Sequence, residues 1–591
     1  MYAWRAVLRA VLLSGVFWAG SATASVYDHI YANGFEVPAD APASDAEAAR
    51  FLTQATFGPT AAEIARLRAI GYAEWINEQL GMPTTLGRPF VEQVVAARTA
   101  AGQGVDQTQR YDRWFWTATY GQDQLRERMA WALSQIFVIS DQNSAISGDV
   151  IPMAEYWDLL ARDAFGSYRT LLGDVTYNPT MGKFLSHFRN QKPSATTSPD
   201  ENYAREVMQL FSVGLILRDI DFTPLPGNIP TYDQTVITHT AKVFTGFTYG
   251  DAPVGSGAPN YSGANFYGGA ITNAGSYAPM ACWGTELFPA SGTGSGNMRH
   301  DITGDDGTTN TPKTVLAGLT IPANQSCSAD VGAELDIIAG HANVAPFISR
   351  QLIQRFVTSN PSPAYIQRVA QVFDDNGYTE RGDLGAVLKA ILLDPEARTL
   401  PTDPVLLANY GKLREPLLRL TAIWRAWDAQ AQPANAYGEI KMSYTTNFLN
   451  SFGQRSLSAP TVFNFYEPDY QQPGYFAGNN LYSPELQITN ESTTYSTTNT
   501  LYNFIQGGYL GMTNPPVDRP LLNLAPITSL TSNSVAMVGE ANRRMMYGSM
   551  SPSMQSVLTS MLQFMSTASN NEKAWSLVYV IALSPEFAAQ R

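Results

Sequence analysis

The segment SPDENYAREVMQLFSVG, residues 198–214, carries the clearest helix signals in this chain of 591 residues. Ser198 and Glu201 have the spacing of a capping box, and Pro199 stands at the first helical position, where a missing N–H costs nothing. Gly214 suits the left-handed conformation that follows a helix end. These signals predict a single helix over nearly the whole segment, with an apolar and a polar face.

The polar face of this predicted helix is a candidate for chemistry. Asn202 and Glu206 lie one turn apart, and Arg205 lies beside them at the i+4 position from Glu201. One interpretation is a buried cluster in which Arg205 orients Glu206 as a base or a ligand. The other is a structural network of ion pairs, which perturbs titration in the same way.

Similar helix signals recur along the chain, separated by short loops. Ser44 with Glu47 and Thr60 with Glu63 form two further capping boxes, each followed by apolar residues at helical spacing. Short loops between short helices favour a mainly α fold, a compact multi-helix bundle. Two stretches rich in Gly, Asn and Tyr, at about 249–311 and 455–535, lack sustained periodicity, and we expect them to be long irregular insertions.

The N-terminal residues have the features of a signal peptide. Arg5 and Arg9 accompany a short apolar run, and Ala22-Thr23-Ala24 gives the small-x-small pattern of a cleavage site. We therefore expect cleavage near Ala24 and a mature protein that is periplasmic or secreted. The expected organisation is a signal peptide at 1–24, an N-terminal linker at 25–43 and a helical domain at 44–591.

Charge and hydropathy narrow the classes of partner. The formal net charge is −13, which argues against nucleic acid, because phosphate binding needs a basic surface. After the signal peptide, no run reaches the roughly 18–20 apolar residues that a membrane helix needs. We expect a soluble exported protein without a transmembrane segment in its mature chain.

The two cysteines, Cys282 and Cys327, lie in one irregular region. Because export permits oxidation, we predict a disulfide between them. No cysteine and histidine spacing typical of a zinc site occurs.

Histidine and acidic residues give a second set of candidates. Among the five histidines, His300, with its neighbour Asp301, and His341 are candidate binding residues. A divalent metal held by such side chains, with Glu206 as an added ligand, is one interpretation. No pair of histidines has the HExxH spacing, and a lone histidine is more often a hydrogen-bonded structural residue. We therefore predict no cofactor and keep a divalent metal as the alternative.

Seven blocks of the sequence together form a recognisable pattern: PDENYAREVMQL (199–210), ARFLTQATFGPT (49–60), LRERMAWALSQIFVIS (125–140), AKVFTGF (241–247), HANVAPFISRQLIQRFV (341–357), FNFYEPDYQQPG (463–474) and SPEF (584–587). These blocks resemble a large bacterial family catalogued as domain of unknown function 1800. The resemblance covers roughly residues 44–591 and implies an exported protein, often accompanied by a second exported family of equally uncertain role. Where many members carry F-W-H-x-H-F, this chain has AWALSQIF at 130–137, so no role of those histidines carries over.

The family has no established activity, so three functions stay open. The first is a cell-envelope or secreted interaction protein that assembles with another exported protein. The second is an enzyme acting on an extracellular polymer or glycan, and the third is a glycan-binding protein that uses the Tyr-rich C-terminal loops. The polar centre of the enzyme would combine Arg126, Glu127, Asn202, Arg205 and Glu206, with His300 and His341 as contributors.

Overall fold

The structure is a computed structural model. It describes residues 38–194, 196–250, 266–267, 269–270, 272–282, 300–305, 311–443, 446–530 and 532–591. The predicted signal peptide and most of the predicted linker lie outside the described residues.

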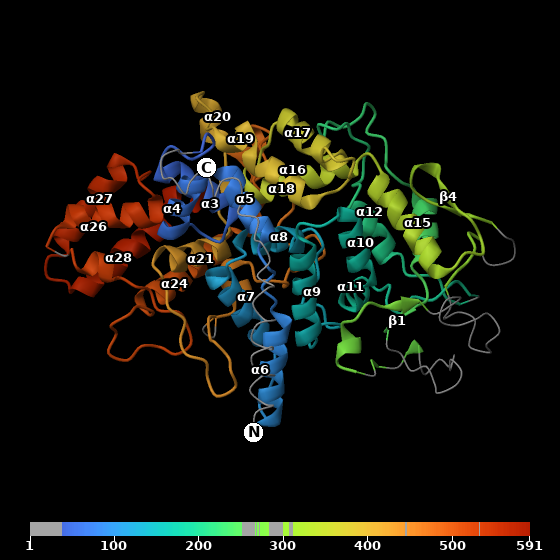
Figure 1. Cartoon of the computed structure of the whole chain (residues 1–591), viewed down its shortest axis with the longest axis horizontal. Helices are drawn as coiled ribbons and strands as arrows, with labels where there is room; N and C mark the ends of the chain where they lie inside the picture. The colour runs from blue at the N-terminus through green and yellow to red at the C-terminus, as the bar shows by residue number, and fades with distance from the viewer. Residues whose placement is uncertain are drawn as a thin grey trace, which may run out of the picture.

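Helices make up most of an elongated body, which confirms the mainly α fold class (Figure 1). The N-terminal helices are α3 (Asp45–Ala55), α4 (Ala61–Ile70), α5 (Tyr72–Gly81), α6 (Arg88–Ala100), α7 (Thr108–Tyr120), α8 (Gln124–Ser134), α9 (Val150–Asp163), α10 (Tyr168–Tyr177), α11 (Pro179–Phe184), α12 (Asn202–Gln209) and α13 (Gln234–Val243). The middle helices are α15 (Cys327–Gly340), α16 (Val344–Phe356), α17 (Pro363–Asp374), α18 (Leu384–Leu393), α19 (Pro395–Arg398), α20 (Pro404–Asn409) and α21 (Pro416–Ala426). The C-terminal helices are α22 (Phe448–Phe452), α23 (Tyr475–Gly478), α24 (Glu491–Gln506), α25 (Ala525–Thr528), α26 (Ser534–Ala541), α27 (Pro552–Phe564), α28 (Asn570–Leu583) and α29 (Pro585–Ala588).

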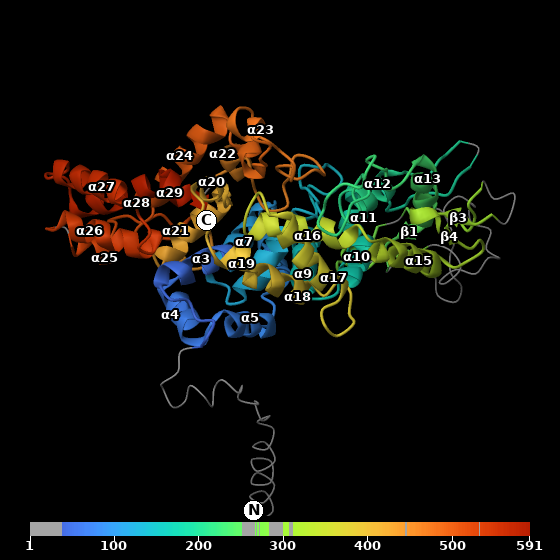
Figure 2. The same cartoon turned by 90° about the horizontal axis from the view of Figure 1, so that it is seen from above.

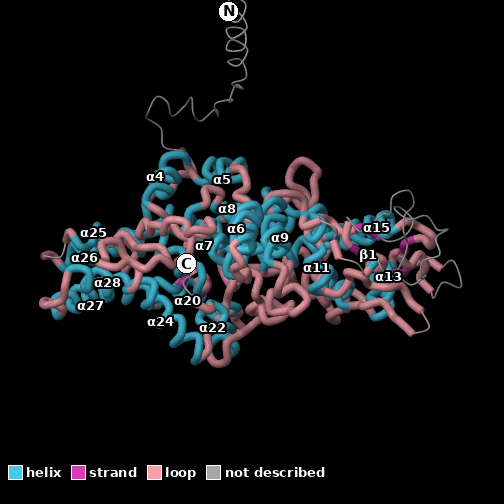
Figure 3. Tube along the Cα trace, turned by 90° about the horizontal axis from the view of Figure 1, so that it is seen from below, coloured by secondary structure: helices cyan, strands magenta, loops and turns pink. Residues whose placement is uncertain are grey.

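Strands in the described residues form three short antiparallel pairs, which Figure 3 shows as small segments among helices and loops. Two pairs lie at the α15 end of the molecule, and the third ties the C-terminus to the segment before α21 (Figure 2). The pairs are β1 (Phe247–Thr248) with β2 (Ala281–Cys282), β3 (Lys313–Thr314) with β4 (Thr320–Ile321), and β5 (Lys412–Leu413) with β6 (Ala589–Gln590). Single-turn 3₁₀ and π segments are η1 (Ala274–Ser276), η3 (Leu316–Gly318), η4 (Pro484–Ile488) and η5 (Asn542–Met546).

One continuous apolar core joins these elements. Its buried side chains run from Ala48 in α3 to Phe587 in α29, and they include fully buried Trp131, Trp424 and Trp427. Helices from both halves of the chain meet in it, because α7 packs on α21 and α16 packs on α8. Burial of this much apolar surface is the main source of stability in such a helical array.

The helix within residues 198–214 is shorter than its sequence signals predict. It begins at Asn202, and the predicted capping box of Ser198 and Glu201 is wrong. The Glu201 carboxylate instead accepts hydrogen bonds from Gln234 and Thr238 of α13. Gly214 has the predicted left-handed conformation, with φ of 71°, after the chain has already left the helix at Gln209.

The second predicted insertion, 455–535, is not irregular throughout. It contains α24, which has 16 residues and begins with a capping box formed by Asn490 and Thr493. Thr493, Thr497 and Thr500 face the core beside Leu501, so threonine methyl groups take positions where a periodicity search looks for aliphatic residues. This stretch therefore contains a helical pattern of buried positions, but threonines occupy several of them in place of aliphatic residues.

Cys282 and Cys327 form the predicted disulfide, with Cα atoms 6.2 Å apart. The bridge joins β2 to the first turn of α15, across the first predicted insertion, which lies only partly within the described residues. Within the described ranges, every helix is too short or too polar to cross a lipid bilayer.

Candidate functional site

The polar face of α12 is only partly buried. Asn202 is exposed, and its backbone N–H donates to Asp200. Arg205 is partly exposed and lies 3.4 Å from Glu201 in an ion pair. The Glu206 carboxylate is 6% exposed, and burial raises its pKa although Arg205 opposes the shift. The ion pair on this face therefore joins Arg205 to Glu201, and Glu206 is the buried acid beside them.

Arg126, predicted to join that face, has a different role in the structure. Its guanidinium reaches backbone carbonyls at the ends of two other helices, Leu80 of α5 and Ala161 of α9, at 3.3 and 3.2 Å. The ring of Phe165 lies 4.4 Å from its central carbon. A cation at helix C-termini complements their exposed carbonyls, so Arg126 fastens α8 to α5 and α9.

Glu127 is buried against a different set of charges from Glu206. Its carboxylate accepts a hydrogen bond from Trp157 at 2.9 Å. Burial, helped by Asp123 and Asp158, raises the pKa of Glu127 well above its usual range. Arg113 partly offsets this rise, whereas Arg205 is the charge that acts on Glu206. The structure therefore separates the five predicted catalytic residues into an α12 group and an α8 group.

The two candidate histidines stand at opposite ends of α15. His300 contacts Asp330 in the first turn, whereas His341 caps the last turn and accepts a hydrogen bond from the N–H of Asn343. Ten residues of helix separate Asp330 from Gly340, or about 15 Å at 1.5 Å per residue. The two histidines therefore cannot act together on one small group.

His300 and Asp301, which lie within the first predicted insertion, belong to a buried polar cluster. His300 Nε2 lies 2.9 Å from Asp330, and the Lys313 ammonium lies 2.5 Å from the same carboxylate oxygen. Asp301 receives the backbone N–H of Thr303 at 3.1 Å. In the same region Glu334 is fully buried, and burial raises its pKa to about 7.

Three of the sequence blocks noted above, 125–140, 341–357 and 463–474, meet in what we term the sealed network. At its centre, the Glu415 carboxylate accepts hydrogen bonds from Trp131, Gln135 and Gln454 at 2.9, 2.9 and 2.6 Å. Lys412 lies 2.8 Å from Glu485 and 4.0 Å from Glu415. The remaining members of the sealed network are Arg128, Arg355 and Tyr466.

The side chains of Lys412 and Glu415 have no solvent exposure, and that of Glu485 has 2%. Burial alone would raise the pKa of Glu415, but Lys412 and Arg128 outweigh it and lower the pKa. A solute would have to unfold the core to reach these groups, so the sealed network serves the fold.

A large pocket with a volume of about 810 Å³ lies beside α7. Residues from α7, from the segment between α21 and α22, from the segment after α22 and from the one after α24 line it, so four separate stretches of sequence build it. We call it the α7 pocket. Its lining residues are Thr108, Tyr111, Gln432, Pro433, Asn435, Glu439, Lys441, Ser443, Thr446, Asn447, Arg455, Val517 and Asp518.

Asp141 does not line the α7 pocket itself but binds residues that form one of its walls. It accepts the hydroxyl of Tyr111 and lies 3.1 Å from Arg110 and 3.3 Å from Arg455. Burial would raise the pKa of Asp141, yet Arg110, Tyr111 and Arg455 together lower it. Both guanidinium groups also lie over the Tyr111 ring, at 4.5 and 4.3 Å. The ring and Arg455 are thereby held in place at the pocket surface.

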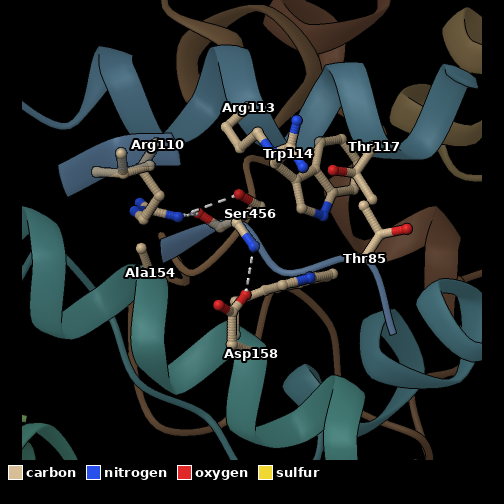
Figure 4. A pocket seen from close by; sticks show the side chains of 11 residues that line it. Thr85, Arg110, Arg113, Trp114, Thr117, Ala154, Asp158 and Ser456 are labelled. Carbon is tan, nitrogen blue, oxygen red and sulfur yellow. Dashed lines mark hydrogen bonds between the residues drawn. The ribbon is translucent and has the colours of Figure 1, made fainter. Parts of the chain in front are cut away.

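Arg110 connects this wall to a much smaller cavity of about 20 Å³, enough for one water molecule (Figure 4). It donates to the carbonyl and hydroxyl of Ser456 at 2.9 and 3.1 Å. Opposite, Asp158 accepts the backbone N–H of Gly87 at 2.8 Å. Trp157, the partner of Glu127, lines the same cavity. The predicted residue Glu127 therefore lies behind this small cavity and not in the α7 pocket.

The opposite wall of the α7 pocket is built on two carboxylates that share Lys441. Its ammonium lies 3.3 Å from Asp112 and 3.3 Å from Glu439. Arg98 adds a second cation 3.1 Å from Glu439. Although burial acts to raise it, hydrogen bonding by Asn435 and the charges of Lys441 and Arg98 lower the pKa of Glu439. Burial dominates at Asp112 and raises its pKa.

The charges of the α7 pocket are thus already paired within the protein. Arg455 faces Asp141, Lys441 faces Glu439 and Asp112, and Asp518 lies 2.9 Å from Arg519. Amide and hydroxyl groups, which can donate and accept hydrogen bonds, share the remaining positions with the apolar side chains of Pro433 and Val517. Such a lining favours an uncharged ligand with several hydroxyl groups over a simple ion.

Sequence reasoning missed the α7 pocket altogether. No local spacing joins Tyr111 to Glu439 and Arg455, because Tyr111 lies more than 300 residues before both of them in the sequence. In the aromatic cluster of residues 463–475, which is of a kind that more often packs loops over a core than lines a groove, Phe465 and Tyr466 are buried, whereas Phe463 and Tyr475 are exposed. A weak signal was the polar, amide-rich composition of 432–447 directly after a helix full of core residues.

The chain belongs to the family described as "Protein of unknown function (DUF1800)", whose model matches residues 50–589. Nearly the whole described structure therefore lies within the family domain. Searches of curated proteins and of solved structures found no match.

Proposed function

We propose that this member of the family is an exported binding protein and that a glycan, or another polyhydroxylated group, occupies the α7 pocket. The observation that carries the proposal is a pocket of 810 Å³ whose charged side chains are neutralised by protein partners. This volume is in the range of small-molecule sites.

The lining matches the chemistry of a sugar. Sugar hydroxyls both donate and accept hydrogen bonds, as do the amides of Gln432, Asn435 and Asn447. Tyr111, Pro433 and Val517 add apolar surface that suits the C–H faces of a sugar ring. Lys441 and Arg455 offer N–H donors with fixed positions, because acidic partners hold both groups.

A glycan array probed with the full mature, oxidised protein tests this function. We expect capture of at least one glycan class by the wild-type protein and its loss in Asn435→Ala, which removes an amide from the pocket rim. Lys389→Ala, which changes an exposed ion on α18, is the matched control and keeps the signal. An array without any capture, or capture that survives Asn435→Ala together with Lys441→Ala, contradicts the proposal.

Export is part of the same proposal. The disulfide Cys282–Cys327 supports an oxidising compartment, since such bonds persist mainly outside the cytoplasm. The N-terminal basic and apolar pattern supports cleavage near Ala24. N-terminal sequencing of native protein should begin at Ser25, and a mature chain beginning at Met1 contradicts the cleavage.

A second candidate function is assembly with another exported protein, the interaction role that the sequence also suggests. Exposed apolar side chains on α27 favour it, because Val557 is 63% and Phe564 91% exposed. Affinity capture from the native cell envelope, with Phe564→Ser as the comparison, should recover a stoichiometric partner that the variant loses. Recovery of the same proteins by both chains, or of none, contradicts it.

An enzyme built on Glu206 is the weaker proposal. Buried Glu206 has Arg205 beside it and Tyr232 nearby, whereas Arg126, Glu127 and both histidines contact other groups. Hydrolysis of an array glycan by wild-type protein, abolished in Glu206→Gln, would establish it against binding alone.

A further inference from the structure

A second large cavity lies where helices from the two ends of the chain meet, and it shares no lining residue with the α7 pocket. Its volume is about 500 Å³, in the range of small-molecule sites. Residues of α3, α4, α26, η5 and the segment after α21 line it. We call it the basic pocket, because three arginines and two aspartates supply its charges. These residues are Arg68, Arg543, Arg544, Asp45 and Asp428.

The backbone around the basic pocket is strained at two positions. Asp428 and Tyr547, which both line the pocket, have positive φ values of 42° and 53°, a region that residues other than glycine rarely adopt. The π segment η5, a helix type that recurs at functional sites, carries Arg543 and Arg544 at the same pocket. Because strained residues cluster at ligand sites, the backbone marks this pocket independently of its charges.

Both aspartates of the basic pocket act on Arg543. The Arg543 guanidinium donates two hydrogen bonds to Glu540, at 2.6 and 2.8 Å. These bonds raise the pKa of Arg543 although burial opposes the rise, and the charges of Asp45 and Asp428 add to it. The two aspartate carboxylates therefore mark two anion positions near one guanidinium group.

The ion pairs at these two positions are exposed. Asp45 lies 2.6 Å from Arg68 with 58% of its side chain exposed, and Asp428 lies 2.9 Å from Arg544 with 61% exposed. Ion pairs with so much exposure contribute little to stability, so an anion from solution can replace the aspartate. In the α7 pocket, by contrast, the acids that pair with Lys441 and Arg455 are buried.

The arginines keep their positions without the aspartates. Arg544 also donates to the carbonyl of Ala426 at 3.1 Å and to Glu540 at 2.8 Å, and it lies 5.4 Å from the centre of the Trp427 ring. Glu540 holds Arg543 as well. A ligand anion would therefore meet guanidinium groups that are already ordered, which lowers the entropic cost of binding.

We propose that the basic pocket binds a small organic dicarboxylate, whose two carboxylates take the places of Asp45 and Asp428 beside the arginines. The proposal is independent of the ligand of the α7 pocket. The planar fork of a guanidinium matches a carboxylate, because it can bind both oxygens at once. Pro59, Ile64 and Ala65 add apolar surface to the lining, which suits the carbon chain of such a ligand.

Equilibrium dialysis of labelled succinate against the full mature, oxidised protein tests the proposal. We expect one equivalent to bind at low ionic strength, and the affinity to fall as sodium chloride is added, because salt screens exposed charges. Inorganic phosphate, which is tetrahedral, is the second probe and should bind more weakly. No succinate binding at low ionic strength, or tighter binding of phosphate, overturns the proposal.

Variants on the two sides of the ion pairs should act in opposite directions. Arg543→Gln should weaken succinate binding at least about tenfold, as the loss of hydrogen bonds to a charged group does. Asp45→Asn should tighten it about two- to fivefold, because it removes an internal competitor held by an exposed pair. Arg162→Gln, at an exposed arginine of α9 that pairs with Glu155, is the matched control and should bind as wild type does.

Urea unfolding of each variant confirms that the compared proteins are folded. The opposite signs separate a built site from general attraction to positive charge, since Asp45→Asn and Arg543→Gln each change the charge by one unit at the same place. Weaker binding in Asp45→Asn, or equal affinity in Arg543→Gln and Arg162→Gln, overturns the proposal.

Discussion

The sealed network and the wall of the α7 pocket use the same residue types with different consequences. Around Glu415, acids and bases are paired in the core, where Lys412 and Glu415 have no exposed side-chain surface. Around Glu439 and Asp141, acids and bases are also paired, but Lys441 is 28% and Arg455 15% exposed beside a cavity of 810 Å³. Charge pairing alone therefore does not mark a functional site. Open space next to paired charges distinguishes the α7 pocket from the sealed network, because a ligand can reach those groups without unfolding the protein.

The largest effect should come from breaking the sealed network. Glu415→Ala removes the acid that acts most strongly on buried Arg128 and leaves Lys412 with Glu485 as its acidic partner, and uncompensated buried charge costs about 3–5 kcal/mol. Urea unfolding followed by circular dichroism measures the loss. A free energy of unfolding within about 1 kcal/mol of the wild-type value would show that the sealed network contributes no more than a surface ion pair. The contrast between the sealed network and the wall of the α7 pocket would then fail.

Removal of the disulfide should have the next largest effect. The double variant Cys282→Ala/Cys327→Ala opens a loop with a sequence separation of 45, and bridges of this kind contribute about 2–4 kcal/mol. Thermal unfolding of the oxidised wild type against the double variant measures it. Equal midpoints would mean that the contacts of β1–β4 with α13 and α15 stabilise this end of the molecule without a contribution from the disulfide.

Glu334 should make stability depend on pH. Its folded pKa of about 7 lies above the usual 4.5, so its contribution is complete below about pH 4.5 and is lost as pH rises through 7. The loss is on the order of 3 kcal/mol. Glu334→Gln, which cannot ionise, should unfold with a flatter pH profile and be the more stable protein at pH 8. Asp158 and Asp163 titrate in both proteins, so a difference between the two pH profiles of unfolding reports on Glu334. Parallel profiles for the two proteins would contradict the expectation.

The smallest effect on stability should come from the pocket wall itself. Lys441→Ala removes a partly exposed ammonium, and such pairs contribute below about 1 kcal/mol. Urea unfolding beside Glu415→Ala gives the direct comparison. A loss as large as that of Glu415→Ala would make the wall a structural element like the sealed network.

Sequence patterns predicted the parts of the fold that depend on local order. Helices α3 and α4 begin directly after the predicted caps Ser44 and Thr60, whose side chains accept the backbone N–H groups of Glu47 and Glu63. The start of α12 was misplaced because Glu201 binds α13 instead of its own helix end. No local pattern could show that competition.

The candidate site could not be predicted for a related reason. Glu206 stands out in the sequence because it lies beside Arg205 on the polar face of a predicted helix, and His300 because the chain has only five histidines; the structure buries both. The α7 pocket instead depends on which distant segments meet. Tyr111 and Arg455 become one wall only through Asp141, whose contacts with both are long-range in sequence.

Calorimetric titration of a glycan captured on the array, into wild-type protein and into Lys441→Ala, tests the central claim most directly. We expect the variant to bind at least about tenfold more weakly, a change of about 1.4 kcal/mol, while its unfolding midpoint in urea stays close to wild type. Equal affinity in the two proteins would contradict the claim that a ligand reaches the paired charges of the α7 pocket.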